Sequence, residues 1–164
     1  MGVSLSYSTM EPVRQEVRQL ILAEANRLRS HHDWWCEPII FFDLPPSARG
    51  DMKLEGDTKL FLDGWTSSSG EYVEVEHMEE YELMVRRDAK FILGQLQLWS
   101  EQYRLNWVLE MADTDYGGIV GGRVSPATIE AFKRDGIDVV SSVDEEEAQR
   151  ISKKYSSRGR FSSL

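Results

Sequence analysis

The chain predicts an α+β fold, a mainly antiparallel sheet of about five strands packed against two to four helices. Residues 89–103 repeat apolar side chains at helical spacing, whereas residues 105–111 alternate apolar and polar ones. Residues 125–136 begin with Ser-Pro and end at a glycine, the pattern of a capped helix. Because short strands alternate with turns rather than with regular crossover helices, we expect antiparallel pairing.

The first predicted helix begins near Ser8, since Ser8 and Glu11 match the capping box of a helix start. Glu24 falls inside the apolar stripe of this helix. A carboxylate in such a place is either paired or raised in pKa. We expect a partner for Glu24, or a stripe that is less buried than its spacing indicates. The stripe comprises Met10, Val13, Val17, Leu20, Ile21, Ala25 and Leu28.

Strands are predicted in the first half of the chain after this helix. Residues 38–44 are apolar without alternation, which suits a strand covered on both faces, and Pro45-Pro46 ends it. Residues 59–62 and 72–76 are short strand-like segments separated by turn-forming residues. Residues 77–87 fit a helix and a strand about equally, so both assignments stay open.

Asp88 stands where an N-cap carboxylate would begin the helix over residues 89–103. Phe91 and Leu98 lie on the side opposite the main apolar stripe of that helix. A helix that is apolar on two sides either packs between two layers or offers one stripe to a partner. We favour packing on both sides. The second arrangement would make Phe91 and Leu98 an interface between copies of the chain.

A strand pair is predicted after this helix. Residues 105–111 indicate a half-buried strand, and residues 113–118 are dense in turn-forming residues. Residues 119–124 can return as the antiparallel partner, with Gly121-Gly122 allowing a bulge or a close backbone approach. The segment therefore predicts two strands joined by a glycine-rich turn.

Helices are predicted at two places near the C-terminus. Ser125 and Pro126 suit the N-cap and first turn of a helix that stops at Gly136. Ser142 and Glu145 repeat the capping-box pattern at the start of a short last helix. These helices complete the predicted α+β arrangement.

Length and composition restrict the class of protein. The 164 residues predict a single domain over residues 8–155 and a basic, disordered tail over residues 156–164. We expect no membrane association, because no apolar run approaches the ~20 residues of a membrane span and the N-terminus has no signal-peptide pattern. The single cysteine, Cys36, excludes an internal disulfide and fits a reducing compartment, so we expect a cytoplasmic location.

Charge is the main functional signal in the sequence. The net charge is −9, and residues 51–88 hold eleven acids against four basic residues. Such a surface repels nucleic acid and attracts cationic proteins, although acidity also serves plain solubility. We therefore predict a basic protein partner for this segment and no nucleic acid. Its acids are Asp51, Glu55, Asp57, Asp63, Glu71, Glu74, Glu76, Glu79, Glu80, Glu82 and Asp88.

Tryptophans suggest where such a partner would be held. Trp99 and Trp107 lie on predicted core faces, whereas Trp34-Trp35 and Trp65 lie at the ends of elements. An exposed aromatic residue among charges is a typical binding hot spot. The predicted partner-binding residues are Trp65, Glu74, Glu76 and Glu79, with Phe91 and Leu98 for self-assembly.

Catalytic patterns are weak. Asp113 and Asp115 flank a turn before Gly117-Gly118, where carboxylates could act as acid and base or bind a cation, but the same residues build an ordinary hairpin turn. His31-His32-Asp33 and His77 lack the spacing of a metal site. No P-loop or nucleophile elbow is present in the sequence, and Cys36 beside Trp34-Trp35 suggests a buried, inert thiol. We predict no metal and no cofactor.

Three hypotheses follow from these observations. The first is a non-enzymatic binding protein, of inhibitor or immunity type, that uses an acidic surface on a basic protein. The second is a small hydrolase or metal-dependent enzyme that uses Asp113, Asp115 or the histidines. The third is a structural subunit that assembles with copies of itself.

Overall fold

The computed structural model describes residues 2–42, 50–61, 64–66, 72–74, 78–111 and 114–155. In chain order its elements are β1 (Gly2–Thr9), α1 (Gln15–His31), β2 (Ile40–Phe41), β3 (Glu55–Phe61), β4 (Gly64–Thr66), β5 (Tyr72–Glu74), α2 (Met78–Tyr103), β6 (Trp107–Met111), β7 (Thr114–Val120), β8 (Arg123–Val124), α3 (Pro126–Arg134) and α4 (Glu145–Tyr155).

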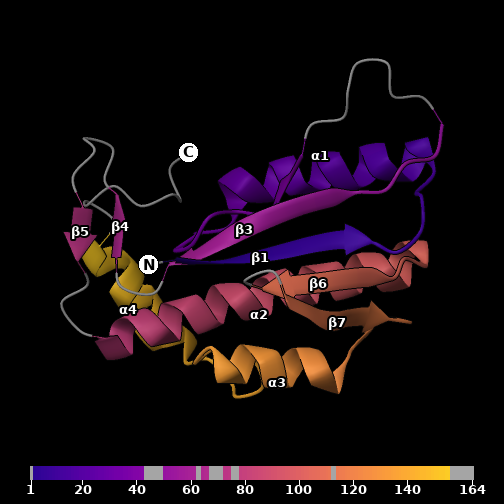
Figure 1. Cartoon of the computed structure of the whole chain (residues 1–164). Helices are drawn as coiled ribbons and strands as arrows, with labels where there is room; N and C mark the ends of the chain where they lie inside the picture. Colours follow the sequence, from indigo (N-terminus) through magenta and orange to yellow (C-terminus); the bar gives the residue numbers. More distant parts are fainter. Residues whose placement is uncertain are drawn as a thin grey trace.

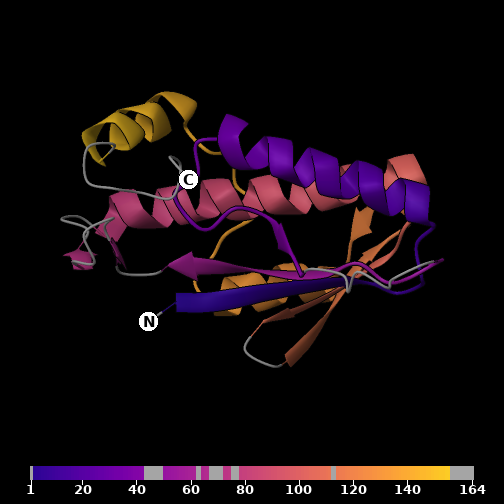
Figure 2. The ribbon, with the colours of Figure 1, turned by 90° about the horizontal axis from the view of Figure 1, so that it is seen from above.

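The main sheet has six antiparallel strands in the order β2-β3-β1-β6-β7-β8, and β4 pairs with β5 in a separate two-stranded sheet (Figure 1). Helices α1 and α2 lie side by side against one face of the main sheet (Figure 2). The predicted α+β class with an antiparallel sheet is confirmed, with slightly more strands than expected. In the part of the chain that the structure describes, no helix is both long and apolar enough to cross a bilayer.

Strand β1 lies in the centre of the sheet, where the sequence pattern predicted the start of a helix. The helix start at Ser8 is wrong, because Ser8 pairs with Glu55 of β3 and α1 begins only at Gln15. The side chains of Leu5 and Tyr7 are almost fully buried, and the intervening serines are partly exposed. Alternate residues of β1 are buried, and its backbone pairs with a strand on each side. These contacts stabilise a strand, whereas the capping box at Ser8 is not followed by a helix until Gln15.

Helix α2 is longer than predicted. The sequence left helix and strand open for residues 77–87. Residues 78–87 are helical, and His77 lies outside the described residues. The N-cap prediction for Asp88 is wrong, since Asp88 is buried in the interior of α2. Tyr81, Met84 and Val85 extend the apolar stripe toward the N-terminus, so burial continues the helix past the proposed cap.

The hairpin after β6 differs in detail from its prediction. Strand β7 already begins at Thr114, so the predicted turn over residues 113–118 is wrong for residues 114–118, and Asp113 lies outside the described residues. Gly121 and Gly122 have φ values of 59° and 79° and form the tight turn between β7 and β8. The two positive φ angles explain why glycines stand there, in a turn rather than a bulge.

The two C-terminal helices have well-defined starts. Ser125 accepts a hydrogen bond from the Thr128 backbone N–H at 3.2 Å, and Gly136, with φ of 80°, follows the end of α3. The N-cap at Ser125 and the glycine after the helix end confirm the predicted helix. Helix α4 instead begins after Asp144, whose carboxylate accepts from the Glu147 N–H at 3.1 Å, so the predicted capping box at Ser142 is wrong. An aspartate nearer to the first helical N–H groups takes that role.

In the segment predicted as a doubly covered strand over residues 38–44, the described part, residues 38–42, forms the two-residue edge strand β2, and residues 43–46 lie outside the described residues. The Tyr7 hydroxyl holds β2 in place, since it accepts from the Ile40 N–H at 2.9 Å and donates to the Ile40 carbonyl at 3.1 Å. Phe41 then packs edge-on against Tyr7, with ring centroids 5.6 Å apart. An apolar run is compatible with an edge strand when only one of its faces meets the core.

We expect Gly94→Ala to stabilise the protein. Gly94 is an exposed residue in the middle of α2, and a Cβ atom added there would meet no atom within 4 Å beyond its chain neighbours and the backbone of its own helix. Alanine removes backbone freedom from the unfolded chain, so the free energy of unfolding in a urea titration should rise by about 0.5 to 1 kcal/mol. Gly118→Ala is the matched contrast, because its Cβ would lie 1.7 Å from the Trp107 carbonyl oxygen. A loss of stability in Gly94→Ala would contradict the regular, exposed helix at this position.

Candidate functional site

The acids of the segment 51–88 divide into buried and exposed groups. Glu80 and Asp88 are 8% and 0% exposed, so neither can belong to a docking surface. Asp51, Glu55, Glu79 and Glu82 are exposed, and Asp57 is half-buried. Asp63, Glu71 and Glu76 lie outside the described residues, as do the side chains of Trp65 and Glu74 in the β4–β5 hairpin.

Asp88 holds the loop after α1 against α2. Its Oδ2 atom accepts from the backbone N–H groups of Trp35 at 2.7 Å and Cys36 at 2.8 Å. Its Oδ1 atom lies 3.2 Å from His32 Nε2 and accepts from the Arg87 guanidinium at 3.0 and 3.1 Å. The carboxylate thus satisfies backbone donors in the interior, which is a structural role.

The adjacent histidines face different surroundings. His31 is exposed, with Nδ1 2.8 Å from the Arg27 carbonyl oxygen. His32 stacks on Phe91, with ring centroids 3.9 Å apart, and meets Asp88. Within the described residues no three histidine, cysteine or carboxylate side chains gather closely enough to hold a metal ion.

The aromatic residues of this loop are structural as well. Trp34 and Trp35 are 0% and 1% exposed, so the idea of a hot spot there is wrong. Cys36 is buried, as predicted, and forms no disulfide. Phe91 is half-buried beneath His32 and Trp34, whereas Leu98 is 52% exposed. The second stripe of α2 is therefore covered at one end and open at the other.

Glu24 is a surface residue. Its carboxylate accepts from Arg27 at 2.6 and 3.0 Å, and its side chain is 36% exposed. The hydrogen bond from Arg27 lowers the pKa of Glu24 below its ordinary value, whereas the alternative of an unpaired, buried carboxylate would raise it. The apolar stripe is less buried here than its spacing indicated, and Glu24 shows no sign of catalytic tuning.

A cleft of about 550 Å³ opens between the loop after α1, helix α2 and helix α4. Its lining includes two cationic residues, Arg87 and Lys90. Arg87 is already bound to Asp33 and Asp88, and Asp33 accepts from Ser152. Among the described residues, the hydrogen-bond partner of the His32 ring is Asp88, so no serine or cysteine nucleophile is activated by this histidine.

Figure 2 shows α1 and α2 on one face of the main sheet. Because Leu5, Tyr7 and Leu109 are buried, the residues that alternate with them lie on the opposite face, and these include an acidic row. Ser6 of β1 is paired with Asp57 of β3 on one side and with Glu110 of β6 on the other. Adjacent strands are about 4.8 Å apart, so the backbones of Asp57 and Glu110 lie roughly 10 Å from each other. Glu110 is also paired with Asp115 of β7, whose side chain is not among the described ones.

The surroundings of this row are polar. Glu55 is exposed opposite Ser8, and Lys59 is exposed opposite Ser4. Ser4, Ser6 and Ser8 are partly exposed, and their small side chains leave β1 low between its neighbours. The alternation of serine with apolar residues in β1 was the sequence signal for this face, and the capping-box prediction at Ser8 obscured it.

The described site residues provide an acidic, serine-lined sheet face, buried structural carboxylates and no metal-ligand cluster. No family model, no curated protein and no solved structure matches the chain. The function must therefore be argued from the chemistry of these surfaces.

Proposed function

We propose that the protein is a non-enzymatic binding module. It docks a basic protein on the face of its main sheet opposite α1 and α2, which we call the open face. The observation that carries the proposal is the row formed by Asp57, Ser6 and Glu110 across three adjacent strands. An inhibitor or an immunity-type protein is the concrete form. A cytoplasmic location accompanies the proposal, because a single cysteine that forms no disulfide fits a reducing compartment.

Charge supports a basic partner over other occupants of this face. The chain carries a net charge of −9, and Glu55, Asp57 and Glu110 place carboxylates on the uncovered side of the sheet. A protein with a lysine- or arginine-rich surface would be steered toward this face, while nucleic acid would be repelled. The small serine side chains of β1 leave room for long basic side chains of a partner to reach the carboxylates on the two flanking strands, β3 and β6.

A second part of the proposed surface comes from the rest of the acidic segment. Glu79 is exposed on the first turn of α2, so its carboxylate is accessible to a partner. Trp65, Glu74 and Glu76 complete it as proposed contacts, with Trp65 as the aromatic anchor. Self-assembly through Phe91 and Leu98 is less favoured, because Phe91 already packs under His32 and Trp34.

The test is capture of a partner by the wild-type protein and by a charge-reversed variant of the sheet face. We expect Glu55→Lys/Asp57→Lys/Glu110→Lys to slow association with the purified partner about tenfold or more at low salt, since exposed charges act mainly on the association rate. Biolayer interferometry at several salt concentrations measures this rate. The effect should shrink as salt screens the charges.

The matched control reverses three exposed acids outside the acidic segment and the sheet face, in Glu11→Lys/Glu16→Lys/Glu130→Lys. Both variants change the net charge equally, so a rate loss confined to the sheet-face variant supports docking there. Equal losses in both variants would point to the overall charge alone. If no partner is captured and Phe91→Asp/Leu98→Asp dissolves a dimer seen by light scattering, self-assembly is the better account.

A further inference from the structure

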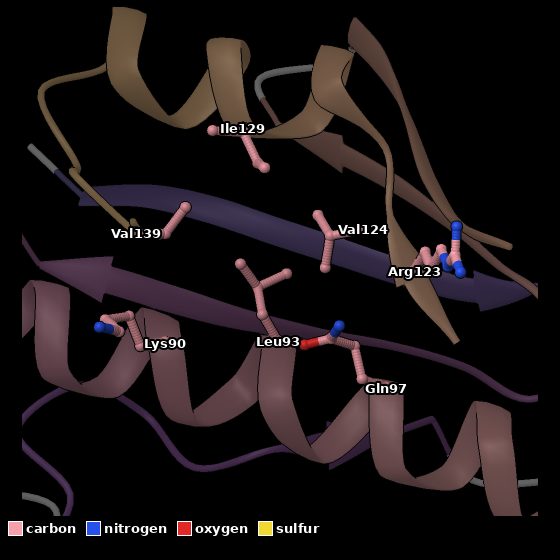
Figure 3. A pocket seen from close by; sticks show the side chains of 7 residues that line it. All are labelled: Lys90, Leu93, Gln97, Arg123, Val124, Ile129 and Val139. Carbon is pink, nitrogen blue, oxygen red and sulfur yellow. The ribbon is translucent and has the colours of Figure 1, made fainter. Parts of the chain in front are cut away.

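A separate pocket lies between α2, β8, α3 and the segment that follows α3 (Figure 3). Its volume is about 370 Å³, within the range of small-molecule sites. It does not include the residues of the acidic row, so it is independent of the proposed function.

Apolar side chains from four segments form the floor of this pocket. Leu93 of α2 is nearly buried, and Val124, Ile129 and Val139 are half-buried. Figure 3 shows all four pointing toward one common space. Protein interiors normally close such spaces by interdigitation, so an open hollow lined by aliphatic groups is suited to an apolar ligand.

The ends of the pocket are polar and cationic. Lys90 and Gln97 are seven residues apart on α2, or about 10 Å along the helix axis. Lys90 donates to the Ser141 carbonyl at 2.6 Å and has further N–H donors to offer, while Gln97 donates to the Gly122 carbonyl at 3.1 Å. The backbone of Arg123 pairs with Val120, whereas its side chain is exposed at the far end and its guanidinium makes no hydrogen bond or ion pair with another described residue.

The charge of this pocket is opposite to that of the chain. Lys90 and Arg123 are its charged lining residues, and no carboxylate belongs to the lining, although the chain as a whole carries −9. A guanidinium that is free of protein partners can bind a carboxylate through paired, charge-assisted hydrogen bonds. We propose that the pocket binds a small carboxylic acid with an apolar body, whose carboxylate meets Arg123 and whose hydrocarbon part covers Leu93.

Octanoate is the probe that tests this proposal, with 1-octanol as its neutral analogue. Titration of the isotope-labelled protein by octanoate should shift the backbone NMR signals of Leu93, Val124 and Ile129. Arg123→Glu should weaken octanoate binding about tenfold or more, the order expected for a lost charge-assisted contact. Lys53→Glu is the control, an equal charge change at an exposed position outside the pocket.

A second variant, Ile129→Trp, tests the apolar floor by filling the space. It should abolish the octanoate shifts while leaving the spectrum of a folded protein. The proposal is overturned if octanoate gives no shifts at millimolar concentration, if octanol binds as tightly as octanoate, or if Arg123→Glu and Lys53→Glu weaken binding equally.

Discussion

Asp88→Ala should lower the free energy of unfolding by about 3 to 5 kcal/mol, the cost of removing one partner from a buried, charged hydrogen-bond network. The substitution would leave the backbone N–H groups of Trp35 and Cys36 without their acceptor in the interior. It would also remove the anion that faces Arg87, whose side chain is only 12% exposed. Urea unfolding followed by tryptophan fluorescence measures the loss.

Glu82→Ala is the matched control, because Glu82 is an exposed acid of the same helix. It should change stability by no more than about 0.5 kcal/mol, as is usual for surface positions. If Asp88→Ala behaves like Glu82→Ala, the carboxylate does not anchor the loop after α1, and the structural role assigned to it fails.

Glu80→Ala should cost about 2 to 3 kcal/mol at neutral pH, because it leaves the buried Tyr155 hydroxyl without its acceptor. Glu80 also accepts from Lys154 at 3.1 Å and from Arg150 at 3.3 Å, so this carboxylate docks α4 onto α2. The same urea titration, with Glu82→Ala as its control, measures the loss.

The effect of Glu80 should depend on pH. Burial raises the pKa of Glu80, but hydrogen bonds from Tyr155, Lys154 and Arg150 together outweigh burial and hold the pKa below its ordinary value of 4.5. A carboxyl group with a lowered pKa stabilises the fold fully above its ordinary pKa and loses that contribution as the pH falls. The stability difference between wild type and Glu80→Ala should therefore be largest above about pH 4.5 and shrink below it.

Acids that do not interact with Glu80, such as Asp138, cancel from this comparison. Hydrogen bonds from the Ser141 hydroxyl and backbone N–H and from the Val140 N–H lower the pKa of Asp138 to about 2, so Asp138 also weakens the fold in acid. Asp138 titrates in both proteins, however, and does not contribute to their difference. A difference that stays constant from pH 7 to acid would contradict the charged, paired state of Glu80.

Local sequence patterns predicted the parts of the fold that depend on neighbouring residues. Ser125, Pro126 and Gly136 defined α3 correctly, because capping is decided within one helical turn. The alternation in residues 105–111 likewise located β6, which begins two residues later than predicted, at Trp107. These signals need no knowledge of the tertiary structure.

Long-range contacts decided the parts that were missed. Ser8 matches a capping box, but pairing of β1 with both β3 and β6 makes it a strand residue. Asp88 is of a residue type that often caps helix starts, yet it accepts hydrogen bonds from a loop more than fifty residues away in sequence. No local pattern carries that information.

The sequence predicted that the candidate docking surface is acidic, but it predicted only part of the position of that surface. The acids of the segment 51–88 include Glu55 and Asp57 of the open face, but Glu80 and Asp88 are internal. Glu110 lies outside that segment and joins the row only through the register of β6 with β1. Net charge can be counted from a sequence, whereas the gathering of acids on one face follows from strand order.

The central claim, docking of a basic protein on the open sheet face, is tested most directly by NMR chemical-shift mapping with the purified captured partner. We expect the largest changes on the backbone signals of Ser6, Asp57 and Glu110. We also expect these changes to disappear in Glu55→Lys/Asp57→Lys/Glu110→Lys, whereas the control variant Glu11→Lys/Glu16→Lys/Glu130→Lys should retain them. Changes confined to the outer surfaces of α1 and α2, with no shift on β1, β3 or β6, would contradict the claim.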